Sequence, residues 1–134
     1  MAQILLIEPD RLLARTYYDI LSHAGHTVRI CATAQGGVYC ADEFRPDVVI
    51  LELQLVAHSG IEFLYEFRSY PDWDTIPVIV HTNVPAGEFS GSWKLLRHQL
   101  GVIQYLYKPV TTLKSLVSTV HEVVPALPRP PLAA

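Results

Sequence analysis

Short, mostly apolar runs alternate along the chain with longer amphipathic stretches. Each run is rich in aliphatic and β-branched side chains, a composition typical of strands that are covered on both faces. The runs occupy residues 3–7, 27–31, 48–51, 76–81 and 102–107. We therefore predict five short strands that are buried in a sheet.

Between these runs, apolar residues recur at intervals of three and four, the spacing of a helix with one buried face. Asp10 is placed to cap the first helix and Gly25 to end it. Residues 84–92 are rich in Pro, Gly and Ser, so the fourth helix is expected to start late, near Trp93. Gly60, which opens the third helix, is expected to permit a positive φ. The predicted helices occupy residues 11–24, 33–44, 60–67, 93–100 and 113–124.

Five strands that alternate with five helices predict an α/β fold, a doubly wound parallel sheet with helices on both faces. In such sheets the functional site lies beyond the carboxyl ends of the strands. One domain is expected over residues 1–124, followed by a proline-rich tail or linker over residues 125–134. Pro125 and Pro128 form a P-x-x-P pattern, which fits a polyproline II ligand as well as a semi-rigid linker.

Composition narrows the function classes. Half of the 134 residues are hydrophobic, which is enough for a core, and ten basic against thirteen acidic residues argue against direct binding of nucleic acid. No apolar run approaches the roughly 18 residues of a membrane span. The first residues also lack the basic and apolar regions of a secretory signal. We therefore expect a cytoplasmic domain with no nucleic-acid or membrane partner.

Cysteine and histidine usage gives no sign of a metal site. Cys31 and Cys40 are the only cysteines, and neither lies in a C-x-x-C motif or in a zinc-binding spacing. Both are expected to be small buried apolar side chains. The six histidines are scattered, with no pair spaced to meet on one helix face.

The residues that follow the predicted strands form an unusual set: Glu8, Asp10, Glu52, Thr82 and Lys108. Three carboxylates at one edge would repel one another unless a cation or the lysine neutralised them. A flavodoxin-like module for a phosphorylated small molecule is disfavoured, because Glu8 and Asp10 would repel the anion after the first strand.

Four segments carry these residues: I-L-L-I-E-P-D, V-V-I-L-E-L-Q-L-V-A-H-S-G, P-V-I-V-H-T-N and Y-L-Y-K-P-V-T. With them, residues 3 to 124 resemble the receiver domain of two-component response regulators, which act in signal transduction. The resemblance implies a flavodoxin-like (βα)5 fold with strand order 2-1-3-4-5. It also implies that Thr82 and Lys108 contact a phosphoryl group and that the orientation of Tyr105 reports the switch.

Two positions depart from that family. Glu52 stands where receivers carry the phosphoacceptor Asp, and Pro9 replaces the second residue of the acidic pair that helps to hold Mg²⁺. An added methylene displaces the carboxylate, and a misplacement of about 1 Å can cost roughly 10²-fold in rate. Pro9 removes an oxygen ligand from an ion that demands near-octahedral geometry. We therefore interpret the chain as a pseudo-receiver that is not an enzyme; the alternative is a phosphorylatable, Mg²⁺-dependent receiver with an altered site.

The altered site has more than one possible role. An ion pair between Glu52 and Lys108 would either imitate the phosphorylated state or make a fixed scaffold. Asp10 is favoured as a helix cap, while a weak divalent-ion site of Glu8, Asp10 and Glu52 stays open, so the expected cofactor is none or weakly bound Mg²⁺.

The resemblance also indicates how such a domain would act. Receivers dock through the face made of their fourth helix, fifth strand and fifth helix, so the expected partner is a histidine kinase, an output domain or a second copy. Large aromatic or guanidinium side chains are common anchors in interfaces. The candidates on that face are Trp93, Arg97 and Tyr107.

Overall fold

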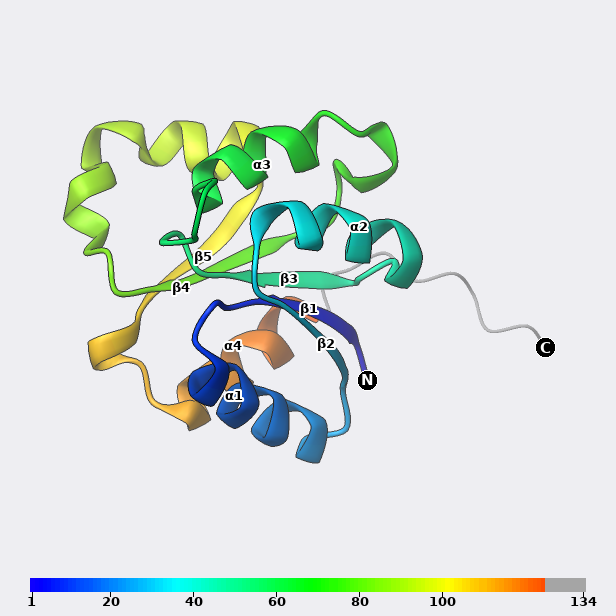
Figure 1. Cartoon of the computed structure of the whole chain (residues 1–134). Helices are drawn as coiled ribbons and strands as arrows, with labels where there is room; N and C mark the ends of the chain where they lie inside the picture. Colours follow the sequence, from blue (N-terminus) through cyan, green and yellow to red (C-terminus); the bar gives the residue numbers. More distant parts are fainter. Residues whose placement is uncertain (125–134) are drawn as a thin grey trace.

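The computed structural model describes residues 1–124, and the tail predicted over residues 125–134 lies outside that part. Five strands form one parallel sheet in the order β2-β1-β3-β4-β5 (Figure 1). The strands are β1 (Gln3–Ile7), β2 (Thr27–Cys31), β3 (Val48–Leu51), β4 (Val78–Thr82) and β5 (Val102–Tyr107). The predicted fold class and strand order are confirmed.

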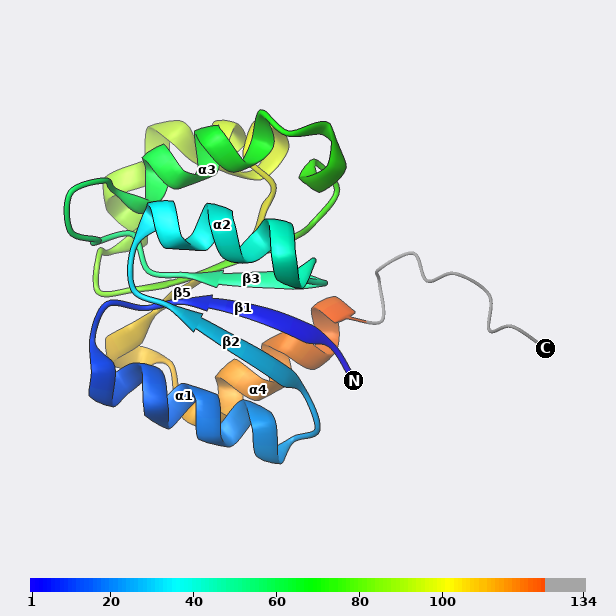
Figure 2. The same ribbon diagram turned by 45° about the vertical axis from the view of Figure 1, so that its right-hand side comes forward.

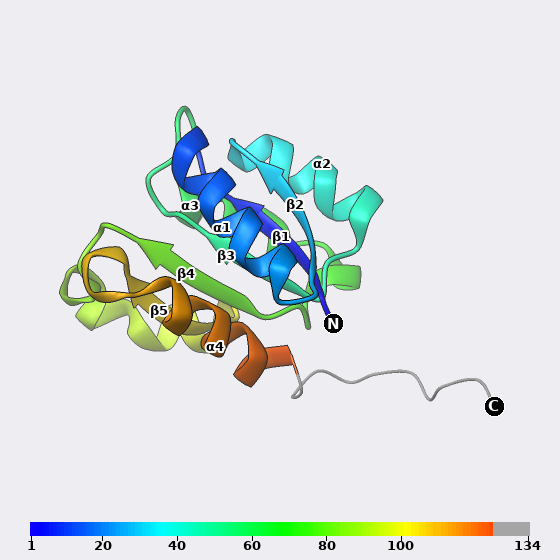
Figure 3. The same ribbon diagram turned by 90° about the horizontal axis from the view of Figure 1, so that it is seen from below.

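Helices cover both faces of the sheet (Figures 1, 2 and 3). One layer holds α1 (Arg11–His23) and α4 (Leu113–Val123), and the other holds α2 (Ala34–Phe44) and α3 (Gly60–Arg68). Successive strand residues point to opposite layers, so Leu5 packs in the α2 and α3 core while Leu6 packs in the α1 and α4 core. This double burial explains why the strand sequences are apolar throughout.

The connection between β4 and β5 differs from the single helix predicted at residues 93–100. A 3-10 helix, η2 (Ala86–Ser92), is followed by a π-helix, η3 (Leu95–Gln99), in which Leu100 N–H donates to the Leu95 carbonyl over 3.0 Å. Gly87 and Gly91 lower the helix propensity of this stretch. Two shorter 3-10 turns, η1 (Pro71–Trp73) and η4 (Lys108–Val110), complete the described elements. Among residues 1–124, no helix is long and apolar enough to cross a membrane.

Gly60 corrects the expectation of a positive φ. Its φ is not in the left-handed region, which Ala57 occupies instead at 70°. A side chain at Gly60 would collide with the backbone of Leu53 and with the Glu52 carbonyl, at 2.7 and 2.8 Å. The glycine is therefore needed for the close approach of α3 to the loop after β3.

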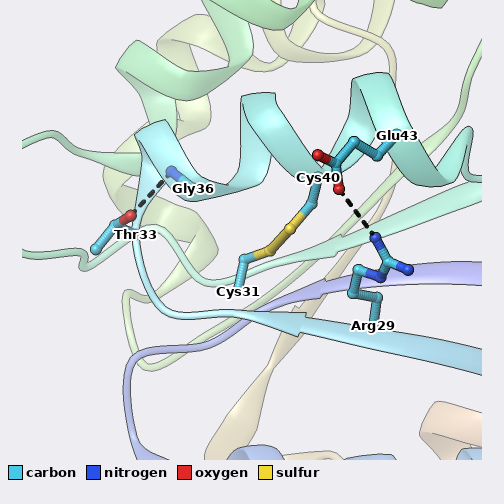
Figure 4. The surroundings of a disulfide bond; sticks show 6 residues. All are labelled: Arg29, Cys31, Thr33, Gly36, Cys40 and Glu43. Atoms are coloured by element: carbon cyan, nitrogen blue, oxygen red, sulfur yellow. Dashed lines mark hydrogen bonds and ion pairs between the residues drawn. A yellow bond between two sulfur atoms is a disulfide. The ribbon is translucent and has the colours of Figure 1, made fainter.

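Cys31 and Cys40 form a disulfide, so the expectation of free apolar side chains is wrong (Figure 4). Cys31 ends β2, and Cys40 lies on α2, which folds back over that strand. Two weaker contacts accompany the bond: the Thr33 hydroxyl caps α2 by accepting from Gly36 N–H over 3.0 Å, and Arg29 pairs with Glu43 at 3.6 Å. A spacing of nine residues matches no cysteine motif, so only the folded chain reveals the pairing.

A half-buried arginine joins the connections that lead into β4 and β5 at the amino edge of the sheet, where the strands begin. Arg68 Nε donates to the Leu100 carbonyl over 2.9 Å, and one terminal nitrogen donates to the Trp73 carbonyl over 2.6 Å. The other terminal nitrogen donates to the carbonyls of Ile76 and Gly101. Gly101 has a φ of 70°, and a side chain there would overlap the guanidinium. The cation is thus held by backbone carbonyls.

Two of the histidines meet at the same edge, although their sequence positions gave no sign of it. Ala2 N–H donates to His26 Nδ1 over 3.0 Å, so the ring proton is on His26 Nε2, which faces His121 Nε2 at 3.0 Å. Burial, with smaller contributions from His121 and the N-terminus, lowers the pKa of His26. The contact therefore joins the start of β2 to α4 while the His26 ring is neutral.

Candidate functional site at the carboxyl edge of the sheet

The register of the sheet brings four polar side chains together where the strands end. Glu8 follows β1, Glu52 follows β3, Thr82 ends β4 and Lys108 follows β5. The residues Glu8, Glu52 and Thr82 are 3%, 4% and 0% exposed, and the Lys108 side chain is 8% exposed. We call these residues the carboxyl-edge site; the structure brings them together, as expected for side chains at the ends of neighbouring parallel strands.

Lys108 lies between the two glutamates. Its Nζ donates to Glu8 Oε1 over 2.6 Å and to Glu52 Oε1 over 2.7 Å. The second oxygen of Glu52 accepts from the Thr82 hydroxyl and from Gln54 N–H, the latter over 3.1 Å. Because Glu52 Oε1 accepts from Lys108 and Glu52 Oε2 accepts from two donors, this carboxylate is held in place without any added ligand.

The charges of the pair are mutually stabilised. Burial alone would raise the pKa of Glu52, but hydrogen bonds from Lys108, Thr82 and Gln54 N–H outweigh it and hold that pKa below its usual value. Burial would likewise lower the pKa of Lys108, but hydrogen bonds to Glu52 and Glu8 outweigh it and raise that pKa. Glu52 and Lys108 are thus both ionised at neutral pH.

Asp10 does not join the carboxyl-edge site. Its carboxylate caps α1 by accepting from Leu12 N–H and Leu13 N–H, each over 3.0 Å, as favoured from the sequence. The Glu8 side chain is turned to Lys108 and to the Asp10 N–H, which donates to Glu8 Oε2 over 3.1 Å. Glu8, Asp10 and Glu52 therefore do not come together as the divalent-ion site that the sequence left open.

The donor set does not fit Mg²⁺ either. Within residues 1–124, no group of three or more His, Cys, Asp or Glu side chains is arranged to hold a metal ion. The ammonium of Lys108 takes the position between the carboxylates of Glu8 and Glu52 that a cation would need. Pro9 adds no side-chain oxygen.

A hydrogen-bonded chain leads from the site to Tyr105. The Thr82 hydroxyl oxygen accepts from Val84 N–H over 3.2 Å, and the Tyr105 hydroxyl donates to the Val84 carbonyl over 2.6 Å. The Tyr105 ring is half-buried against Phe89 and Trp93, with centroid distances of 6.1 and 6.2 Å. Burial raises the pKa of Tyr105 to about 12, so its hydroxyl keeps the proton that it donates. Val84 acts here through its backbone, which no residue-type pattern could indicate.

His81 is a polar neighbour of the site that the sequence reasoning left in a buried strand. It precedes Thr82, is 3% exposed and meets the Tyr17 ring edge-on at 4.9 Å. Burial, aided by the positive charge of Lys108, lowers the pKa of His81 to about 4. The sequence did offer one sign of this polar neighbour, because His81 is a histidine in an otherwise apolar predicted strand.

The family model of the response regulator receiver domain matches residues 4–121. The chain belongs to this family. The receiver is 31% identical over 109 residues to the KDP operon transcriptional regulatory protein KdpE of Escherichia coli (strain K12), covering 81% of this chain and 45% of that protein. It is 33% identical over 109 residues to KdpE of Mycobacterium tuberculosis (strain ATCC 25618 / H37Rv), again covering 81% of this chain and 45% of that protein. The chain thus spans about half the length of the curated relatives that it matches.

Solved structures agree with the observed architecture. The chemotaxis response regulator CheY4 of Vibrio cholerae has a TM-score of 0.80 to the receiver at 23% identity, covering 92% of this chain and 98% of that one. A receiver domain protein from Methanospirillum hungatei JF-1 also reaches 0.80 at 22% identity, covering 93% of this chain and 94% of that one. These likenesses concern the fold of the receiver.

The three interface candidates lie apart from one another. Trp93 is half-buried beside Tyr105 and lines a hollow of about 450 Å³ with it. Arg97 is exposed and lines a different hollow, near Arg68 at the amino edge. Tyr107 is half-buried at the end of β5, where its carbonyl accepts from Thr111 over 2.8 Å. Of the three candidates, the structure therefore places only Trp93 beside Tyr105.

Proposed function

We propose that this receiver works as a protein-interaction domain in two-component signalling whose switch is engaged by Glu52 itself. Phosphorylation at this position is lost or inefficient in this proposal, and the domain is not an enzyme. The observation that carries the proposal is the bridge of Glu52 between Lys108 and Thr82. Those are the two residues that, by family resemblance, meet a phosphoryl group.

The geometry supports a silent acceptor for two reasons. Phosphoryl transfer needs a nucleophile free to lie in line with the leaving group, with a cation to neutralise the developing charge. Both oxygens of Glu52 already accept hydrogen bonds, and the ammonium of Lys108 lies where a metal would act. Freeing the nucleophile would break a buried ion pair.

The contacts of Thr82 favour an engaged switch over an inert scaffold. Thr82 donates to Glu52 and accepts from Val84 N–H, and the Val84 carbonyl holds the Tyr105 hydroxyl. The position of Tyr105 therefore depends on a carboxylate that the chain supplies at all times. We expect the surface around Tyr105 and Trp93 to stay in one arrangement without a phosphodonor.

Partners follow from this surface. The hollow of about 450 Å³ beside Tyr105 and Trp93 is lined by η2 and β5 and could accept an apolar side chain of a kinase, an output domain or a second copy. The curated relatives are named transcriptional regulatory proteins and are about twice the length of this chain. An output domain elsewhere in the same system is consistent with those names.

Intact-protein mass tests the loss of phosphorylation. The protein, a Glu52→Asp variant and a Glu52→Gln variant are incubated with Mg²⁺ and acetyl phosphate. We expect the natural protein to stay unmodified. A gain of one phosphoryl mass by the natural protein and not by Glu52→Gln would overturn the proposal. Modification of Glu52→Asp alone would show that the acceptor substitution silences an otherwise competent site.

Amide NMR tests the engaged switch. Glu52→Gln weakens the charged hydrogen bonds to Lys108 and Thr82, so amide shifts are expected at Val84 and Tyr105. Glu62→Gln is the matched control, because Glu62 pairs with His58 on the surface at 2.8 Å. Equal and small shifts at Val84 and Tyr105 in both variants would reject the coupling while leaving the phosphorylation result intact.

A further inference from the structure

A hollow of about 310 Å³ opens on the α2 and α3 side of the sheet, outside the carboxyl-edge site. We call it the aromatic hollow. The end of α2 and the segment after α3, which form it, lie at the same end of the molecule as the N-terminus (Figure 2). Its walls are Val38, Tyr39, Asp42, Tyr70, Asp72 and Trp73.

Of the aromatic side chains that line the hollow, Trp73 is buried at its base, whereas Tyr39 and Tyr70 are exposed at its rim. Trp73 is 8% exposed, stacks on Phe67 at 5.2 Å and meets Tyr70 at 4.6 Å. Tyr39 and Tyr70 are 68% and 40% exposed. Folding therefore leaves two large aromatic surfaces open beside a rigid tryptophan, an arrangement favoured at binding sites.

The Trp73 indole adds a hydrogen-bond donor. Among the described residues, none accepts a hydrogen bond from this N–H, and Trp73 is 8% exposed where it lines the hollow. A tryptophan N–H beside an apolar surface usually finds an acceptor when a ligand covers it. The hollow that Trp73 lines is where a backbone carbonyl can meet it.

The charge of the hollow selects a cation. Asp42 and Asp72 form no ion pair with any described residue, and the lining residues include no Lys, Arg or His. Aromatic faces are negative and attract cations, which adds to the field of the two carboxylates. A planar guanidinium fits best, because it stacks on rings and donates to carboxylates in the same pose.

We propose that the aromatic hollow binds the proline-rich segment 125–132 of a second copy, with Arg129 as the cation. The sequence of that segment is P-A-L-P-R-P-P-L. Prolines favour an extended helix whose apolar face packs against aromatic grooves and whose carbonyls stay free to accept hydrogen bonds. The end of α4 lies across the sheet from α2 and α3 (Figures 1 and 3), which favours a second copy over the same copy.

A peptide titration tests the ligand chemistry. The full chain carrying Arg129→Gln keeps the hollow intact, and its amide and indole NMR signals are followed while a synthetic peptide of residues 125–132 is added. We expect saturable shifts at the Trp73 indole and near Tyr39 and Tyr70. A peptide with Gln in place of the arginine should bind about tenfold more weakly. No saturable shift, or equal binding of the two peptides, would overturn the proposal.

Paired variants test the hollow and the source of the ligand. Asp42→Asn with Asp72→Asn should weaken peptide binding, whereas Asp19→Asn, an exposed carboxylate paired with Arg15 on α1, should not. The natural chain should self-associate in sedimentation equilibrium, and Arg129→Gln should abolish the association. Peptide binding by a chain that stays monomeric at all concentrations would reject the second copy as the source.

Discussion

The two edges of the sheet each hold a cation at least half-buried, but they satisfy it in different ways. At the carboxyl edge, Lys108 lies between two carboxylates at 2.6 and 2.7 Å. At the amino edge, Arg68 donates to four backbone carbonyls and forms no ion pair with a described residue. One edge therefore holds charge with side chains, and the other holds it with the backbone.

That difference decides whether the partners of each cation can change while the fold stays intact. Burial lowers the pKa of Arg68, with Asp74 opposing it, whereas the carboxylates raise the pKa of Lys108 despite its burial. Carboxylates can be titrated or replaced by another anion, so the partners of Lys108 can change without refolding. Carbonyls cannot, so the partners of Arg68 change only if the loops move.

Removal of the lysine should have the largest effect. Lys108→Met leaves the carboxylates of Glu8 and Glu52 buried without a counter-charge, which should cost about 3–5 kcal/mol of unfolding free energy at pH 7. The loss should shrink as the pH falls, because protonation of Glu52 removes one of the unpaired charges. Urea unfolding at pH 7 and pH 5 measures both values.

The double variant Lys108→Met with Glu52→Gln is the control for that experiment. It should recover part of the stability at pH 7, since only one buried carboxylate then remains. A loss in Lys108→Met that is equally large at both pH values would show that the ion pair is not its cause.

Removal of the arginine should cost somewhat less and should not depend on pH. Arg68→Met leaves the carbonyls of Leu100 and Ile76 without their donor and the Trp73 carbonyl with Ile76 N–H alone, and we expect a loss of about 2–4 kcal/mol. Arg97→Met is the matched control, because Arg97 is exposed. A loss that varied between pH 7 and pH 5 beyond that of the control would contradict a clip made of carbonyls alone.

The buried histidine at the carboxyl edge should give the next effect. The pKa of His81 is about 4 in the fold against 6.5 in a free side chain, so the unfolded chain binds more protons between these values. Stability from a neutral His81 is present above pH 6.5 and falls as the pH drops. From pH 7 to pH 5 the expected loss is about 2 kcal/mol.

His81→Leu tests this by flattening that part of the stability profile, measured by urea unfolding across the same range. His98→Asn, at an exposed position, should leave the slope unchanged. An unaltered slope in His81→Leu would place the acid sensitivity elsewhere in the receiver.

Sequence reasoning predicted the carboxyl edge better than the amino edge, for a physical reason. Parallel strands must end at one edge, so Glu8, Glu52 and Lys108 could be placed together once the strands were read from their apolar runs. Each apolar run marks one strand, so the residues at the end of that strand can be identified from the sequence of that segment alone.

The features that the sequence did not predict depend on contacts between distant segments. Cys40 reaches Cys31 only because α2 folds over β2, and Gly60 is required by the backbone of Leu53 rather than by its own φ. The π-helix before Leu100 likewise reflects packing and low propensity together. The pattern of residues within one segment cannot predict a contact with a distant segment.

The smallest predicted effect concerns the histidine contact at the amino edge. His26 accepts from Ala2 N–H and faces His121 at 3.0 Å, and the N-terminal amine adds a further positive charge to its surroundings. Because the pKa of His26 is lowered, the contact contributes above pH 6.5 and is lost as the pH falls below it. The hydrogen bond should be worth about 1 kcal/mol.

Its loss should be separable from that of His81 by location. In amide hydrogen exchange, acidification below pH 6.5 should lower the protection of β2 and of the last turn of α4 before that of β4, after correction for intrinsic rates. His121→Gln should remove this step, because it takes away the ring that faces His26, while Glu122→Gln on the same turn should keep it. Unchanged protection of α4 in the natural protein would mean that the neutral contact holds no helix in place. The amino edge would then depend on the Arg68 clip alone.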